Sequence, residues 1–216
     1  FVIRGASVSA EHISTSHEPL NLKKFIYELD VPVMVGGVAG YTQAKHLMRT
    51  GAAGVLVGFG GGSAMTTRKG LGISAPMATA IADVAAARSD YLDESGGRYV
   101  HVIADGGLSR SGDLVKALAL GADAVMIGAP LARASEAPGQ GWYWGNEAHS
   151  VDFPRGVRTP LGVVGTLEEV LYGPSHHVDG TSNIVGALKR AMATCGYLDL
   201  KKFQKAEMTL VPEYRG

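Results

Sequence analysis

The sequence of 216 residues contains a single cysteine, Cys195, so no disulfide can form within it. This scarcity is typical of a reducing compartment, and we expect a cytoplasmic protein. The formal net charge is also zero, because 20 lysines and arginines balance 20 aspartates and glutamates. The balance argues against a nucleic-acid partner held by electrostatics. No apolar stretch reaches the roughly 20 residues of a membrane span, which argues against a membrane partner.

The amino-acid composition is that of a folded domain. Hydrophobic residues make up 46% of the chain and charged residues 19%, enough to build one sizeable core. The first residue is Phe1 rather than methionine, and it opens an apolar run that has the character of a buried strand. We therefore expect the chain to be part of a longer protein.

A glycine-rich stretch from Gly58 to Arg68 is the most distinctive segment. It follows the apolar run 54–57 and precedes a helix-like run over 77–84. Clustered glycines allow backbone N–H groups to approach an anion closely, since no Cβ intervenes. Glycine and serine clusters also mark ordinary flexible connections, so this stretch alone leaves both interpretations open.

Apolar runs and helical spacing predict alternating strands and helices. The predicted strands lie near residues 1–5, 32–36, 53–58, 99–104 and 123–128. The predicted helices cover 20–29, 42–50, 77–84, 112–120 and 184–194, with a shorter one that begins at Thr166. Each predicted strand is apolar along its length, as expected when both faces of a sheet are covered.

The chain repeats itself. Residues 51–58 match 121–128 without gaps, an offset of 70 residues, and Gly36-Gly37 meets Gly106-Gly107 at the same offset. Tandem strand–helix–strand units indicate a parallel sheet with helical crossovers. A doubly wound sheet would also place its loops at the carboxyl ends of the strands. The repeat and its glycines favour an α/β fold of another kind, the C-terminal part of a (β/α)8 TIM barrel, about strands 4–8.

This interpretation divides the chain into three parts. Residues 1–131 form the back half of the barrel, 132–180 a flap or active-site insertion, and 181–216 a C-terminal helix and tail that complete the domain. Periodicity stops over 132–180, where Trp142 and Trp144 stand close together, and segments of this length without periodicity are often functional flaps. We expect the terminal run 203–211 to pack back on the body.

The fourth predicted strand ends in an aspartate and two glycines. Asp105 could accept hydrogen bonds from a ribose diol, while Gly106 and Gly107 offer N–H groups to a phosphate. The alternative is a turn aspartate bonded to its own backbone. Gly128 ends the next strand and adds a further N–H group. Three glycine-bearing strand ends at one barrel mouth favour a nucleotide phosphate site.

Several motifs resemble those of one family. Gly60–Arg68 resembles a GxGSxCTTR loop, and Ala104–Gly107 with the helix that follows resembles an ADGG…GD…KAL…GA segment. Ala134–Gly139 is similar to a stretch that leads into a mobile flap. All three belong to the IMP dehydrogenase / GMP reductase family of (β/α)8 barrels, and the resemblance covers nearly the whole chain. Gly173–His176 resembles a divergent, actinobacterial branch of that family.

The resemblance implies a role for each matching residue. Those expected to hold the nucleotide phosphate are Ser63, Gly106, Gly107 and Gly128, with Ala129 in place of a serine. Asp105 is expected to bind the ribose hydroxyls, and Thr67 and Arg68 to lie near the reacting centre. Gly60 and Gly62 correspond to a loop that holds a monovalent cation such as K+.

The departures from the family pattern concern catalysis. Met65 occupies the position of the nucleophilic cysteine, whose thiolate forms a thioimidate with IMP before hydride leaves to NAD. A thioether has no proton to lose and cannot form that adduct. Cys195 is no substitute, because the end of the last helix is a place for a small buried thiol. The flap lacks the family's RGMGS motif, and Arg155 and Arg158 are the candidates to replace its catalytic arginine.

The sequence therefore predicts an IMP dehydrogenase-like oxidoreductase. By resemblance it binds a purine nucleoside 5′-monophosphate (IMP, XMP or GMP) and NAD(P), and forms a homotetramer or a larger homo-oligomer. A catalytically silent purine-nucleotide-binding or regulatory protein is the first alternative, because of Met65. An FMN-dependent barrel enzyme is the second, since such enzymes also bind phosphate after their seventh and eighth strands.

Overall fold

The computed structural model describes residues 1–5, 16, 18–65, 67–145 and 158–209. Its main feature is a five-stranded parallel sheet in the order β1-β2-β3-β4-β5. The strands are β1 (Val2–Arg4), β2 (Met34–Val38), β3 (Gly54–Val57), β4 (His101–Asp105) and β5 (Ala124–Met126). Each strand lies beside the one that precedes it in the chain.

This sequential order decides between the two sheet topologies that the sequence allowed. A doubly wound sheet reverses its strand order at a switch point, where its ligand binds. No reversal occurs among the described strands. The fold is therefore the α/β arrangement of a (β/α)8 barrel segment, as predicted.

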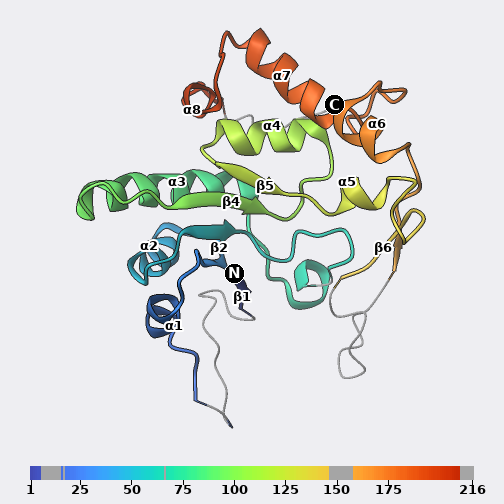
Figure 1. The fold of residues 1–216 in the computed structure, drawn as a ribbon. Coiled ribbons are helices and arrows are strands. Elements are labelled where there is room, and N and C mark those ends of the chain that lie inside the picture. Colours follow the sequence, from blue (N-terminus) through green and yellow to red (C-terminus); the bar gives the residue numbers. More distant parts are fainter. Residues whose placement is uncertain (6–15, 17, 66, 146–157, 210–216) are drawn as a thin grey trace.

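Helices connect successive strands (Figure 1). They are α1 (Leu22–Glu28), α2 (Tyr41–Arg49), α3 (Met77–Glu94) and α4 (Ser111–Ala119), each preceding the next strand in turn. The third helix is ten residues longer than its predicted 77–84, because its alanine-rich sequence continues to Glu94. None of the described helices is both long and apolar enough to cross a membrane.

The core lies between the middle strands and their helices. Val35, Val55 and Val102 of the sheet pack with Leu47 of α2 and Val84 of α3, and all five side chains are fully buried. The two edge strands differ from the prediction of complete burial. β1 exposes Val2 and β5 exposes Met126, since each of these strands has a neighbour on one side only among the described strands.

The predicted repeat is present in the structure. The bounds of α2 and α4 stand 70 residues apart at both ends, 41 to 111 and 49 to 119. Gly51 and Gly121 follow these helices with φ of +101° and +110°, a backbone conformation that favours glycine. In both repeat units the helix thus ends before a glycine with positive φ.

The part of 132–180 that is described has short regular elements. After α5 (Ala129–Ala132), the strands β6 (Trp142–Tyr143) and β7 (Thr159–Pro160) pair antiparallel. The predicted short helix is α6 (Leu167–Tyr172), and Thr166 and Glu169 cap it reciprocally. Residues 146–157, with Arg155, lie outside the described part.

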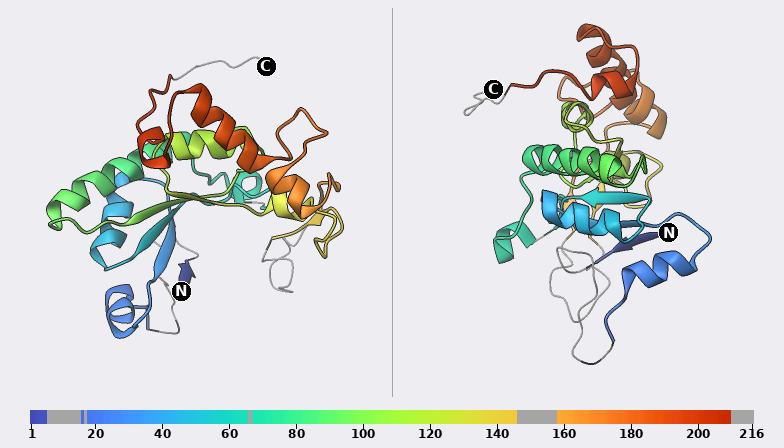
Figure 2. Two further views of the ribbon diagram at one scale, coloured as in Figure 1. Left: turned by 45° about the horizontal axis from the view of Figure 1, so that its top comes forward. Right: turned by 90° about the vertical axis from the view of Figure 1, so that its left-hand side faces the viewer.

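Two further helices follow α6 in the described part of the chain. Figure 1 and Figure 2 show α4 between the sheet and α7 (Ile184–Thr194), while α8 (Leu200–Phe203) lies beside the end of α4. Phe203 is buried against Leu118 and Ala119 of α4, so this part of the C-terminal segment packs on the body as predicted. Cys195 was expected to be buried and is exposed, at the C-cap position that ends α7.

Candidate functional site

A cavity of about 720 Å³ opens at the carboxyl ends of the strands. Its walls come from β1, the loops that follow β3, β4 and β5, and the β6 region. The lining residues used below are Arg4, Gly60, Gly61, Gly62, Ser63, Met65, Thr67, Asp105, Gly106, Gly107, Met126, Gly128, Ala129, Tyr143 and Trp144. In a barrel of this kind, the carboxyl-end face is where active sites are built.

Two glycine loops touch in the cavity wall. A Cβ placed on Gly61 would lie 3.0 Å from the carbonyl carbon of Gly106 and from the nitrogen of Gly107. Gly106 and Gly107 adopt φ of +112° and +74°, which side chains rarely tolerate. The three glycines thus bring two stretches of backbone together in a way that larger residues would prevent, and they leave peptide groups bordering the cavity.

Gly58 fixes the start of the first loop. Its φ is +113°, and a Cβ there would collide with the carbonyl oxygen of Asp105 and lie 2.6 Å from the sulfur of Met77. Its N–H donates to the carbonyl of Val38, 2.7 Å away, which continues the β2–β3 pairing by one residue. The loop therefore leaves β3 pressed against the end of β4.

Asp105 is the acidic side chain of the cavity. The residue is 8% exposed, and its Oδ2 lies 3.6 Å from the Nε of Arg4. Burial raises the pKa of the Asp105 carboxyl, and the Arg4 charge opposes that rise. No described residue donates a hydrogen bond to its carboxylate oxygens. A buried carboxylate with unfilled acceptor sites is suited to hydroxyl donors of a ligand.

Met65 and Thr67 both line the cavity. The N–H of Met65 donates to the carbonyl of Gly62, 3.0 Å away, in a tight turn. Thr67 begins a π-helical turn, Thr67–Leu71, that carries Arg68. Arg68 is exposed and does not line the cavity, so the structure does not bring it to the other predicted residues.

The remaining predicted residues stand at the rim. Ser63 is exposed, and its carbonyl accepts a hydrogen bond of 3.5 Å from the Thr159 hydroxyl of β7. Gly128 and Ala129 begin α5, and a Cβ on Gly128 would lie 2.6 Å from the Tyr143 hydroxyl. The β6–β7 pair thereby contacts both the loop after β3 and the loop after β5.

Among the lining residues that were not predicted, Arg4 and Tyr143 make side-chain contacts within the cavity wall. Arg4 has a sequence signal, its place at the carboxyl end of the first predicted strand, but nothing in the sequence pairs it with Asp105. Tyr143 lies in an aromatic cluster that indicates a flap without indicating a contact. Its neighbour Trp144 packs under the Arg158 guanidinium, whose carbon lies 5.5 Å from the ring centre. Arg158 therefore stands beside the cavity wall.

Comparison with known proteins agrees with this geometry. A sequence model of the IMP dehydrogenase / GMP reductase domain matches residues 8–157. The chain belongs to the IMP dehydrogenase / GMP reductase family.

Similar members of this family support that assignment. A protein of Mycolicibacterium smegmatis described as an uncharacterized oxidoreductase is 58% identical over 212 residues, 97% of this chain and 56% of that protein. The inosine-5′-monophosphate dehydrogenase of Thermoplasma acidophilum is 43% identical over 133 residues, 62% of this chain and 26% of that enzyme.

A solved structure is also similar. The IMP dehydrogenase/GMP reductase-like protein of Corynebacterium glutamicum superposes with a TM-score of 0.85 at 57% identity, over 95% of this chain and 53% of that one. The chain thus spans about half the length of the relatives that it matches over nearly its whole extent.

Proposed function

We propose that the cavity binds a purine nucleoside 5′-monophosphate and that the protein is an IMP dehydrogenase-like oxidoreductase with NAD(P) as hydride partner. The observation that carries the proposal is the position of Asp105, a buried carboxylate without a described hydrogen-bond donor, directly before the paired glycines 106 and 107. A ribose diol supplies two O–H donors to such a carboxylate, and a phosphate is suited to glycine N–H groups.

Each predicted residue has a role in this proposal. Those assigned to the phosphate are Ser63, Gly106, Gly107, Gly128 and Ala129. Thr67 borders the reacting centre, and Arg68 would reach it only after a change in the turn that carries it. NAD(P) would supply or accept a hydride when it is bound.

A monovalent cation is assigned to the loop of Gly60 and Gly62. Backbone carbonyl oxygens are suitable ligands for K+. The carbonyl of Gly62 accepts one hydrogen bond from Met65 and retains a second lone pair. The loop thus has acceptor capacity of the required kind.

Met65 favours a second candidate function, a nucleotide-binding protein without dehydrogenase activity. Its thioether lines the cavity at the position where the family resemblance places a thiol. A covalent thioimidate cannot form there, so oxidation of IMP by the thiolate route is closed to this chain. The binding proposal is independent of this point.

The first test is thermal unfolding of the full-length protein with and without IMP, GMP, XMP and NAD(P). A ligand that binds only the folded state at a hundredfold excess over its dissociation constant stabilises it by about 2.7 kcal/mol. A raised melting temperature with a purine monophosphate supports the site. No change with any of them would overturn the proposal.

Turnover separates the two candidates. Formation or consumption of NAD(P)H with IMP or GMP supports the oxidoreductase, while binding without turnover supports the silent protein. A flavin enzyme is tested by colour, because purified protein without a flavin absorption band would eliminate it.

The proposed oligomeric state and cellular location rest on the family resemblance. We propose a homotetramer in the cytoplasm, with 132–180 acting as a flap on the barrel domain made by 1–131 and 181–216. Tyr143 and Trp144, which line the cavity, connect this flap to the site. Light scattering on the full-length protein would measure the assembly, and a monomer would contradict it.

A further inference from the structure

The cavity contains one positive and one negative side chain among its described lining residues, and the two pair with each other. They are Arg4 at the end of β1 and Asp105 at the end of β4. All other described lining residues are uncharged. The purine monophosphate proposed above gives the carboxylate a role but gives none to the guanidinium.

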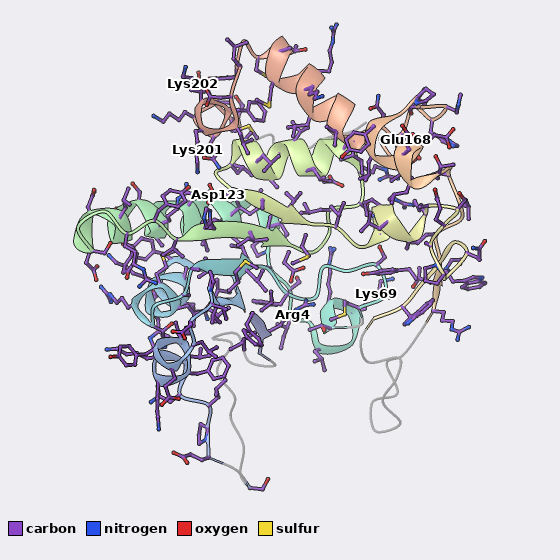
Figure 3. The ribbon with its side chains drawn as sticks, viewed as in Figure 1. Arg4, Lys69, Asp123, Glu168, Lys201 and Lys202 are labelled. Carbon is purple, nitrogen blue, oxygen red and sulfur yellow. The ribbon has the colours of Figure 1, made fainter. Side chains whose placement is uncertain are left out.

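The Arg4 guanidinium is accessible to a ligand. Its side chain is 42% exposed, whereas that of Asp105 is 11% exposed. The Nε–Oδ2 separation of 3.6 Å is an ion pair longer than a hydrogen bond. Arg4 therefore retains N–H donors for a further acceptor, since a guanidinium has five. Figure 3 shows it between β1 and the turn that carries Lys69.

The order of the strands places this cation relative to the phosphate loops. Gly106 and Gly107 follow β4, Gly128 follows β5, and Arg4 ends β1 at the opposite edge of the sheet. A nucleotide with its phosphate at the glycines and its ribose at Asp105 extends its base toward β1. The group that Arg4 meets is therefore on the base side of the ribose.

We propose that Arg4 is a specificity-determining residue that selects a nucleotide with an acidic base. This inference rests on the function proposed above and names its substrate class: an oxopurine 5′-monophosphate whose ring ionises near neutral pH. The xanthine ring of XMP is of this kind, while the rings of IMP and GMP are neutral there. An anionic ring forms a charge-assisted hydrogen bond with a guanidinium, about twice as strong as a neutral one.

The test is the ratio of dissociation constants for IMP and XMP, measured by calorimetry on the full-length protein and three variants. We expect the wild type to bind XMP at least about tenfold more tightly than IMP, in line with hydrogen bonds to charged groups. Arg4→Gln should bring the ratio close to one, and Arg4→Lys should retain part of the preference. Lys69→Gln removes an exposed charge that does not line the cavity and should leave the ratio unchanged.

The ratio of the IMP and XMP dissociation constants separates a direct contact of Arg4 with the base from its effect on Asp105. Loss of the ion pair alone would change the affinities for IMP and XMP together, because both carry the same ribose. A wild-type ratio near one, or an unchanged ratio in Arg4→Gln, would overturn this inference while the proposed function stands. Failure of every purine monophosphate to bind would instead overturn the proposed function.

Discussion

Arg4 and Asp105 form an ion pair although two strands lie between theirs in the sheet. In a flat sheet, strands separated by three spacings lie about 14 Å apart, too far for these two side chains to meet. The sheet is therefore curved, and its concave side brings the end of β1 toward the end of β4. This curvature is that of a barrel wall, and it closes the cavity on the β1 side.

Asp105→Asn should abolish tight nucleotide binding without destabilising the unliganded protein. Two charge-assisted hydrogen bonds to the ribose are weakened, each worth about 1.5–3 kcal/mol, so affinity for a purine monophosphate should fall at least about tenfold. Because burial raises the pKa of this carboxyl, its ionised form costs folding free energy at neutral pH. Calorimetric binding and melting temperatures at neutral pH check both parts.

The effect of Asp105→Asn on the stability of the unliganded protein should depend on pH. An aspartate with a raised pKa favours folding most below its unfolded pKa and loses that contribution as pH rises through the folded pKa. The melting-temperature advantage of Asp105→Asn should therefore shrink as the solution is acidified. Unchanged nucleotide affinity in this variant would contradict the ribose assignment.

Gly61→Ala should separate the two glycine loops. Its Cβ would lie 3.0 Å from backbone atoms of Gly106 and Gly107, which cannot rotate away, so we expect a loss of about 1–3 kcal/mol in unfolding free energy and weaker nucleotide binding. Gly112→Ala is the matched control. It lies on α4, where the new methyl meets nothing within 4 Å apart from its chain neighbours and its own helix backbone, and it should stabilise the helix by about 0.5–1 kcal/mol. Equal binding by both variants would argue against phosphate contact at these loops.

Met65→Cys should supply the missing thiol. We expect the wild type to form no covalent adduct with IMP and the variant to gain NAD(P)-dependent oxidation of IMP. The absorbance of the reduced cofactor measures this reaction. Met126→Cys is the control, since Met126 lines the same cavity at the end of β5. Turnover by the wild type at the level of Met65→Cys would show that the reaction proceeds without this thiol.

Asp123→Asn should destabilise the fold and leave the site intact. The buried Asp123 carboxylate precedes β5 and accepts hydrogen bonds from Arg88 at 2.8 Å and Tyr99 at 2.6 Å, while Lys201 of α8 pairs with it. Figure 3 shows Asp123 and Lys201 on the side of the molecule near α8, away from Arg4. Removing one partner of a buried pair costs about 3 kcal/mol or more, which denaturant unfolding would measure.

The effect of Asp123 depends on pH in the opposite sense to that of Asp105. Burial alone would raise its pKa, but hydrogen bonds from Lys201 and Tyr99 hold the pKa of this carboxyl well below the usual range. Its contribution is present above the ordinary aspartate value of 3.8 and is lost as pH falls further. Asp83→Asn, at an exposed position of α3, should change stability little at any pH. Equal stability of the two variants at neutral pH would contradict this account.

The sequence by itself determined what depends on neighbours along the chain. Periodicity predicted the helices between strands, and the bounds of α7 agree with the predicted 184–194 at both ends. The 70-residue repeat predicted the common ends of α2 and α4. Glycines 106 and 107 were recognisable because their chemistry is local: a missing Cβ and a backbone with positive φ.

Only the tertiary structure decided what depends on neighbours in space. The strand order separated a barrel segment from a doubly wound sheet, which share the same local pattern. Arg68 is exposed and does not line the cavity, and Cys195 is exposed, since burial depends on which elements pack above a residue. Arg4 and Asp105 meet because the sheet curves, and curvature sums small twists over several strands, so no single stretch of sequence records it.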